Sequence, residues 1–164
     1  MTTPTIELTN SSQPFLRYLE AWYNGLQPLR LSEMVGDAPE RVACISVDVI
    51  NGFCTQGPLA SERVARIAQP VADLFERAHR LGVSNFALTQ DTHDPETPDF
   101  QAYPPPCVRG TAESDTVPEI AALSFFESIT IIPKNSLSSS IGTGLGEWLA
   151  QRPQVDRFIV VGDC

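Results

Sequence analysis

The sequence predicts a doubly wound α/β fold, in which helices cover both faces of a parallel sheet. Four runs of branched apolar residues, each of strand length, alternate with segments that carry helical spacing or helix-terminating Pro and Gly. This alternation is typical of parallel sheets, because a parallel connection has to cross over a face of the sheet. The length of 164 residues and the 42% hydrophobic content are sufficient for one domain with a sizeable core.

The first forty residues predict a helical extension. After a polar lead-in to about Ser12, a helix is expected from Pro14 to a stop at Gly25, and its apolar residues recur at helical spacing: Phe15, Leu16, Leu19, Trp22 and Tyr23. Residues 26–40 contain Pro and Gly and predict a connection with at most one short helical turn. We therefore expect an N-terminal extension over residues 1–40 and an α/β domain over residues 41–164.

Strands are expected at residues 41–50, 83–89, 128–132 and 157–161, and the first of them carries apolar residues on both faces. Between the first two, the apolar spacing predicts a short helix, a bend before Pro70, and a second helix that Gly82 ends. Further helices are expected at residues 117–123 and after Thr143. Residues 90–116 form a long, Pro-rich loop.

Charge and cysteine usage limit the partners and the compartment. The net charge of −9 makes nucleic acids and anionic membrane surfaces poor partners, and no apolar run reaches the length of a membrane span. The cysteines at positions 44, 54, 107 and 164 are widely spaced, which favours buried free thiols. A reduced, cytoplasmic setting is the expectation.

Polar residues follow three of the expected strands: Asp48 the first, Asp91 with His93 the second, and Lys134 the third. Because parallel strands end at a common edge, these side chains are expected to converge there. A lysine beside a buried aspartate would offset the desolvation of the acid. The alternative for each residue alone is a structural role, with Asp48 capping a loop and Lys134 solvated at a strand end.

Five segments in order resemble the isochorismatase-like cysteine hydrolases, the superfamily that includes nicotinamidases. They are Ser46-Val47-Asp48-Val49-Ile50-Asn51-Gly52-Phe53, Thr89-Gln90-Asp91-Thr92-His93, Pro106-Cys107-Val108-Arg109-Gly110-Thr111, Ile132-Pro133-Lys134 with Gly142-Thr143-Gly144-Leu145, and Val160-Val161-Gly162. The resemblance implies a Rossmann-like three-layer α/β/α fold with strand order 3-2-1-4-5-6, of which about four strands lie within these residues. It spans about residues 41–164.

The resemblance also implies roles for individual residues. Asp48 would be the base for a cysteine nucleophile, Lys134 would stabilise negative charge, and Phe53 would line the pocket, unless it only packs beneath the first turn. The family pattern places the nucleophile four positions beyond Cys164, while Cys164 itself falls on a structural position. These residues alone are therefore expected to be inactive, with the remaining strands supplied by further residues or another polypeptide.

The same resemblance bears on cofactors and partners. Asp91 and His93 match metal ligands, but Pro106 stands where nicotinamidases carry a second histidine, so no cofactor is required and a divalent metal such as zinc stays open. The Asp-x-His pattern favours hydrolysis of a small-molecule amide. A homo-oligomer is also expected. The alternative is a non-catalytic binding or scaffolding domain that kept the fold.

Overall fold

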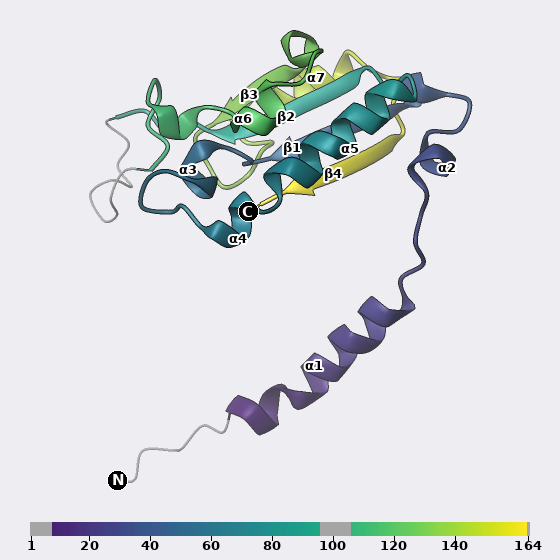
Figure 1. Cartoon of the computed structure of the whole chain (residues 1–164), viewed down its shortest axis with the longest axis vertical. Helices are drawn as coiled ribbons and strands as arrows, with labels where there is room; N and C mark the ends of the chain where they lie inside the picture. The colour runs from purple at the N-terminus through teal and green to yellow at the C-terminus, as the bar shows by residue number, and fades with distance from the viewer. Residues whose placement is uncertain (1–7, 96–105, 164) are drawn as a thin grey trace. The chain divides into compact units, whose positions relative to one another are not determined.

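The computed structural model describes residues 8–95 and 106–163 (Figure 1). The chain divides into two compact units, one up to Arg30 and one from Leu31 onward. The first unit contains the helix α1 (Leu8–Gly25), and the second contains the sheet. The domain boundary expected at residues 40 and 41 stays a prediction. Residues 31–40 include α2 (Leu31–Val35), whose Val35 is buried in the core of the second unit.

The sheet of the second unit has four parallel strands in the order β3-β2-β1-β4. Their bounds are β1 (Val42–Val47), β2 (Asn85–Asp91), β3 (Thr130–Lys134) and β4 (Arg157–Gly162). Val47 pairs with Thr89 and with Gly162, and Asp91 pairs with Lys134, so all four strands end at one edge. This order and direction confirm the parallel α/β fold class.

One face of the sheet packs against α5 (Ala68–Arg80), which lies along the strands in Figure 1. The larger apolar core joins Phe75 and Ala78 of this helix to Val42, Phe86 and Leu88 of the sheet. Pro70 lies in the first turn of α5, where a missing N–H does not disturb the helix. The chain leaves α5 through Gly82, which has φ +92°, a conformation that favours glycine.

The opposite face packs against α7 (Leu145–Ala150). The strand residues Ala43, Ile45, Ala87 and Ile132 form a second, smaller core with Trp148 of this helix. Apolar residues on both faces are what a parallel strand between two helical layers requires. The remaining elements are short: η1 (Pro39–Arg41), α3 (Asn51–Cys54), α4 (Glu62–Ala65), η3 (Ala112–Ser114), α6 (Pro118–Ala121) and η4 (Phe126–Ser128).

The observed elements differ from the expected ones mainly at their ends. α1 begins at Leu8, ahead of the expected start at Pro14, so Pro14 lies inside the helix and not at its first position. β2 and β3 each extend two residues further than expected and end on Asp91 and Lys134. A polar side chain at a strand end does not prevent the backbone hydrogen bonds between strands. The prediction, which ended each strand at its last apolar or weakly polar residue, therefore placed these two ends too early. None of the described helices combines the length and apolar character needed to cross a membrane.

Candidate active site

Asp48 directly follows β1 and has an unusual backbone conformation. Its φ is +56°, in the left-handed region that only glycine, and less often Asn or Asp, adopts readily. The Asp48 N–H donates to the Thr89 carbonyl at 2.9 Å, and the carboxylate atom Oδ1 accepts the Asp91 N–H at 2.9 Å. The residue is only 5% exposed. The carboxylate is therefore fixed at the edge of the sheet by the neighbouring strand.

Lys134, the last residue of β3, extends its side chain to the same point. Its Nζ lies 2.8 Å from Asp48 Oδ2, pairs also with Asp91 Oδ1, and donates to the Ser136 carbonyl at 3.2 Å. Lys134 is 3% exposed and is the only lysine among the 164 residues. The structure thus brings together three of the residues singled out by the sequence, in one buried ion-pair cluster of Asp48, Lys134 and Asp91.

Burial and charge act in opposite directions within this cluster. Burial raises the pKa of Asp48, the hydrogen bond from Lys134 lowers it in part, and the nearby Asp91 charge raises it. Burial alone would lower the pKa of Lys134, but hydrogen bonds to Asp48 and Asp91 outweigh burial and raise that pKa. The lysine is therefore held as a cation, and the Asp48 carboxylate has a stronger affinity for a proton than an exposed aspartate has.

His93 lies beside this cluster rather than within it. Its Nε2 is 3.3 Å from Asp91 Oδ2, and its Nδ1 is 2.6 Å from Asn135 Oδ1, so the ring is held between two side chains. The His93 N–H donates to the Cys107 carbonyl at 3.0 Å, and the Arg109 N–H donates to the His93 carbonyl at 2.8 Å. The loop that begins at Cys107 therefore fixes the backbone that carries His93.

The same loop is fixed in turn by Glu113 and by glycines after β1. The Cys107 N–H donates to Glu113 Oε2 at 3.0 Å. A Cβ on Gly57 would lie 2.5 Å from the Glu113 carboxylate, and a Cβ on Gly52 would lie 2.5 Å from Cys107 Sγ. Only glycine leaves room for this approach. The sequence analysis did not identify Glu113 or Asn135. Asn135 could have been identified, because it directly follows Lys134 at the end of β3.

The residues that the structure describes do not form the three-ligand metal site that a catalytic zinc requires. Within residues 8–95 and 106–163, no group of three His, Cys, Asp or Glu side chains is suitably placed to hold a metal ion. One Asp91 oxygen faces Lys134 and the other faces His93, while Pro106 offers no ligand atom. We therefore derive no chemical step through a metal.

The described cysteines do not supply a nucleophile. Cys44, Cys54 and Cys107 are free and buried, as the sequence predicted. Burial, with nearby carboxylates, raises the pKa of Cys107 to about 12, and burial raises the pKa of Cys44 to about 12 and that of Cys54 to about 11. A thiol with such a pKa is almost entirely protonated at neutral pH. Cys164 lies outside the described residues.

The end of β4 leads the chain past Asp48. Gly162 has φ +127°, and a Cβ at this position would lie 2.0 Å from the Val47 carbonyl oxygen. The Asp163 N–H donates to that same oxygen at 2.9 Å. A hollow of about 340 Å³ opens here, lined by Val47, Val160, Val161, Gly162 and Asp163. Asp163, the residue that follows β4, therefore lies beside the carboxyl end of β1.

Phe53 lies on α3 and is half-buried. It packs against the larger core on the α5 face. This contact accounts for its position as a packing residue, and its role in a substrate pocket stays a prediction.

A parallel sheet with a buried Asp–Lys pair at its carboxyl edge is what the resemblance to cysteine hydrolases implied, and comparison with known proteins gives the same class. The isochorismatase domain matches residues 42–164, and the chain belongs to this family. It is 32% identical over 140 residues to a nicotinamidase/pyrazinamidase of Mycobacterium tuberculosis, covering 73% of this chain and 70% of that protein. It is 29% identical over 136 residues to nicotinamidase 1 of Arabidopsis thaliana, covering 75% of this chain.

Solved structures show the same fold. The pyrazinamidase/nicotinamidase of Streptococcus mutans superposes with a TM-score of 0.65 at 25% identity, covering 75% of this chain and 72% of that chain. A pyrazinamidase of Pyrococcus horikoshii, solved in complex with zinc, gives 0.64 at 23% identity, covering 76% and 71%. The chain spans 54% of the length of the Arabidopsis relative and 70% of the mycobacterial one.

Proposed function

We propose that this protein is a cysteine hydrolase that cleaves the C–N bond of a small-molecule amide. The observation that carries the proposal is the buried cluster in which the chain's only lysine, Lys134, lies 2.8 Å from Asp48. A buried charge pair is costly unless its environment compensates it, and perturbed pKa values of this kind gather at functional sites. The similarity to two nicotinamidases supports amides as the substrate class.

In the proposed reaction, Asp48 accepts the proton of a cysteine thiol supplied by the segment that follows β4, expected four positions beyond Cys164. The thiolate attacks the amide carbonyl, and backbone N–H groups of the turn carrying the cysteine bind the oxyanion. The proton on Asp48 passes to the leaving nitrogen, the C–N bond breaks, and ammonia departs from a thioester. Water then gives a proton to Asp48 and its hydroxide to the carbonyl, which releases the acid and the thiol.

Lys134 has an electrostatic role in this scheme. The raised pKa of Lys134 keeps its ammonium charged beside the Asp48 carboxylate throughout the cycle. A fixed cation favours the thiolate and compensates the negative charge of Asp48 when it is ionised. The hydrogen bond from Asp163 to Val47, the residue before Asp48, supports delivery of the nucleophile to this point.

The second candidate is a non-catalytic binding domain of the same family. Pro106, at the position of a family metal ligand, favours it. The Asp48–Lys134 pair favours the enzyme, because a buried pair without a role costs stability. The cytoplasmic location and the homo-oligomer also stay predictions.

The test of the proposed reaction is Asp48→Asn in the complete protein. Asparagine tolerates the left-handed backbone, so the variant removes the base and not the fold. We expect ammonia release from a panel of small amides, beginning with nicotinamide, to fall at least about 100-fold. The matched control is Asp73→Asn on the exposed side of α5, which should leave the rate unchanged. Near-normal turnover by Asp48→Asn would refute the base, and wild-type protein inactive on every amide would favour the binding domain.

The metal question has its own test. We expect Pro106→His to raise the zinc content of the purified complete protein, because it restores an imidazole on the loop that fixes His93. Elemental analysis measures this directly, with Pro118→His at the start of α6 as the control. Equal zinc in both variants would mean that position 106 does not face Asp91 and His93.

A further inference from the structure

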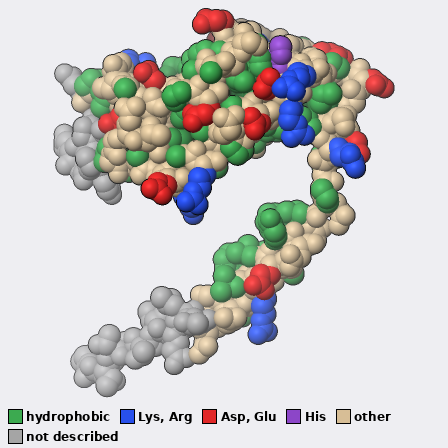
Figure 2. All heavy atoms as spheres, viewed as in Figure 1, with side chains coloured by type: hydrophobic (Ala, Val, Ile, Leu, Met, Phe, Trp, Pro, Cys, Tyr) green, Lys and Arg blue, Asp and Glu red, His purple; other side chains and the backbone are tan. Residues whose placement is uncertain are grey.

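The helix α1 has an apolar side that its own unit does not cover. Figure 2 shows hydrophobic side chains gathered along one side of this helix. Four aromatic rings are strongly exposed: Phe15 by 61%, Tyr18 by 63%, Trp22 by 55% and Tyr23 by 71%. Among the described residues, α1 is the one helix of the unit that ends at Arg30, so that unit offers nothing to pack on them.

The apolar residues of α1 are spaced so that they lie on one side of the helix. Phe15, Leu19 and Trp22 follow at intervals of four and three residues, the spacing of a 3.5-residue repeat, and Leu26 and Leu29 continue the same intervals beyond the end of the helix. Leu26 and Leu29 lie just past the end of α1, and both are at least half exposed. An apolar side of this kind is typical of a helix that packs against another surface.

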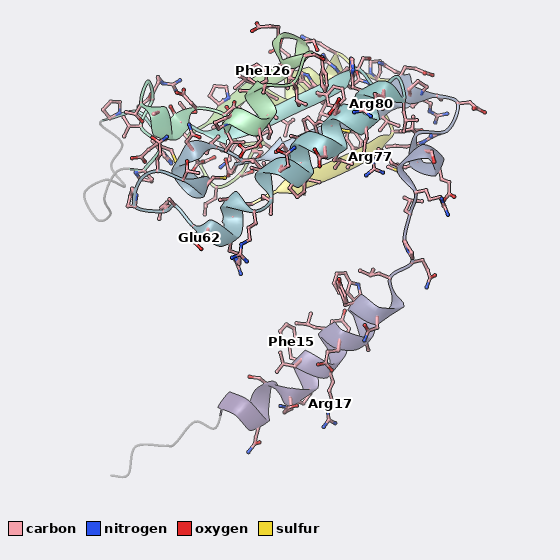
Figure 3. The ribbon with its side chains drawn as sticks, in the orientation of Figure 1. Phe15, Arg17, Glu62, Arg77, Arg80 and Phe126 are labelled. Atoms are coloured by element: carbon pink, nitrogen blue, oxygen red, sulfur yellow. The ribbon has the colours of Figure 1, made fainter. Side chains whose placement is uncertain are left out.

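Charge on α1 is low and lies away from this repeat. Residues 8–25 contain two charged side chains, Arg17 and Glu20, of opposite sign. Figure 3 shows Arg17 and Phe15 on opposite sides of the helix. Two copies of α1 can therefore approach on the apolar side without bringing like charges together, although the whole chain has a net charge of −9.

We propose that the apolar side of α1 pairs with the same side of α1 from a second copy of the chain. The four exposed rings alone present about 500 Å², taking roughly 200 Å² for each ring. Two copies would then bury ~1,000 Å² before the leucines are counted, which reaches the lower bound of a specific interface. The surface is self-complementary, as a two-fold dimer requires. This inference is independent of the proposed hydrolase activity.

Two other occupants fit the observations less well. Helices that lie on membranes carry many Lys and Arg residues on the polar face, whereas α1 carries one Arg and one Glu. Packing against a different protein would explain the 3.5-residue repeat equally well. A second copy is favoured because it is present wherever the chain is present. Both occupants are outcomes of the experiment below.

The experiment is sedimentation velocity of the complete chain over a range of concentrations. We expect a dimer that dissociates on dilution, and a dimer Kd at least about tenfold higher in Phe15→Glu/Leu19→Glu. The matched control is Arg17→Glu, which lowers the net charge by the same two units on the opposite side of α1 and should stay dimeric. A wild-type monomer, or a dimer that persists unchanged in the double variant, would overturn the proposal.

Fluorescence of Trp22 provides a readout that needs no disruptive variant. The chain has two tryptophans, and Trp148 is 4% exposed, so subtraction of the Trp22→Phe spectrum isolates the emission of Trp22. We expect this emission to shift to longer wavelength as the wild-type chain is diluted. A blue emission that does not change with concentration would place Trp22 against its own chain and overturn the proposal. Binding of a monomer to vesicles of anionic lipid, with the same blue shift, would also overturn it.

Discussion

Lys134 shows how one residue can be buried and charged at the same time. Its ammonium is surrounded by the Asp48 and Asp91 carboxylates and the Ser136 carbonyl, which replace the water that it loses. The three ionised side chains carry one net negative charge. Removal of Lys134 therefore leaves two buried carboxylates without a counter-ion, whereas removal of one aspartate leaves a neutral pair.

Replacement of Lys134 should destabilise the fold strongly. We expect Lys134→Met to lower the free energy of unfolding by about 3–5 kcal/mol at neutral pH, because two buried carboxylates lose their counter-ion. Urea unfolding of the complete protein measures it. Arg80→Met is the control, since Arg80 forms an exposed ion pair with Glu76 and should change stability by about 1 kcal/mol or less. Equal effects in both variants would mean that water reaches Lys134 freely.

The pH dependence of activity should report the Asp48 carboxylate. Because burial raises the pKa of Asp48, the base becomes ionised at a higher pH than an ordinary aspartate with a pKa near 3.9. The acidic limb of kcat/KM should therefore lie above about pH 4. In Lys134→Met any residual activity should show the limb at still higher pH, because the hydrogen bond that lowers the pKa of Asp48 is lost. An acidic limb at the same pH in Lys134→Met and in the wild type would mean that the ionisation of Asp48 does not control kcat/KM.

The pKa shifts of Asp48 and Lys134 also determine how the stability of the fold changes with pH. The pKa of Asp48 is raised on folding, so its contribution is fully present below its unfolded pKa and is lost as the pH rises through the folded value. The pKa of Lys134 is also raised, so its contribution persists through neutral pH and is lost only as the pH rises through its folded value, above about 10.4. At neutral pH the lysine thus stabilises a carboxylate that would otherwise oppose folding.

At the scale of the element, the end of β4 depends on one glycine. We expect Gly162→Ala to lower stability by about 1–3 kcal/mol or more, because φ +127° and the Val47 carbonyl leave no room for a Cβ. Thermal unfolding measures the loss, and activity of the complete protein should fall with it if the following segment carries the nucleophile. Gly146→Ala, in α7 with open space around it, is the control and should be neutral or stabilising by about 0.5–1 kcal/mol. Similar melting temperatures would show that β4 adjusts its backbone.

Among the secondary-structure elements, the strands were the most predictable from the sequence. Runs of apolar residues predicted all four strands, and the alternation with helices predicted their parallel direction. The strand ends were less predictable, because Asp91 and Lys134 are polar and still complete the ladder. The start of α1 was missed for a similar reason: residues 9–13 are polar, and local helix formation there does not depend on an apolar side.

At the scale of the whole molecule, the buried cores lie entirely in the unit that begins at Leu31. We therefore expect a chain without residues 1–30 to keep its melting temperature within a few degrees. Circular dichroism during heating measures this, with the intact chain as reference. A large loss of stability would mean that α1 contributes to the fold of the α/β unit and not only to contacts between copies.

The sequence alone determined the parallel α/β class and, through the family resemblance, the strand order. It also determined the convergence of Asp48, Asp91 and Lys134, because the apolar runs are local properties of the chain and parallel strands end at a common edge. The tertiary structure decided which of these side chains touch. It placed Lys134 between two carboxylates, set His93 beside Asn135, and fixed the loop at Cys107 through Glu113. Such contacts depend on the register of neighbouring strands and on backbone approaches at glycines, which no local pattern of residues specifies.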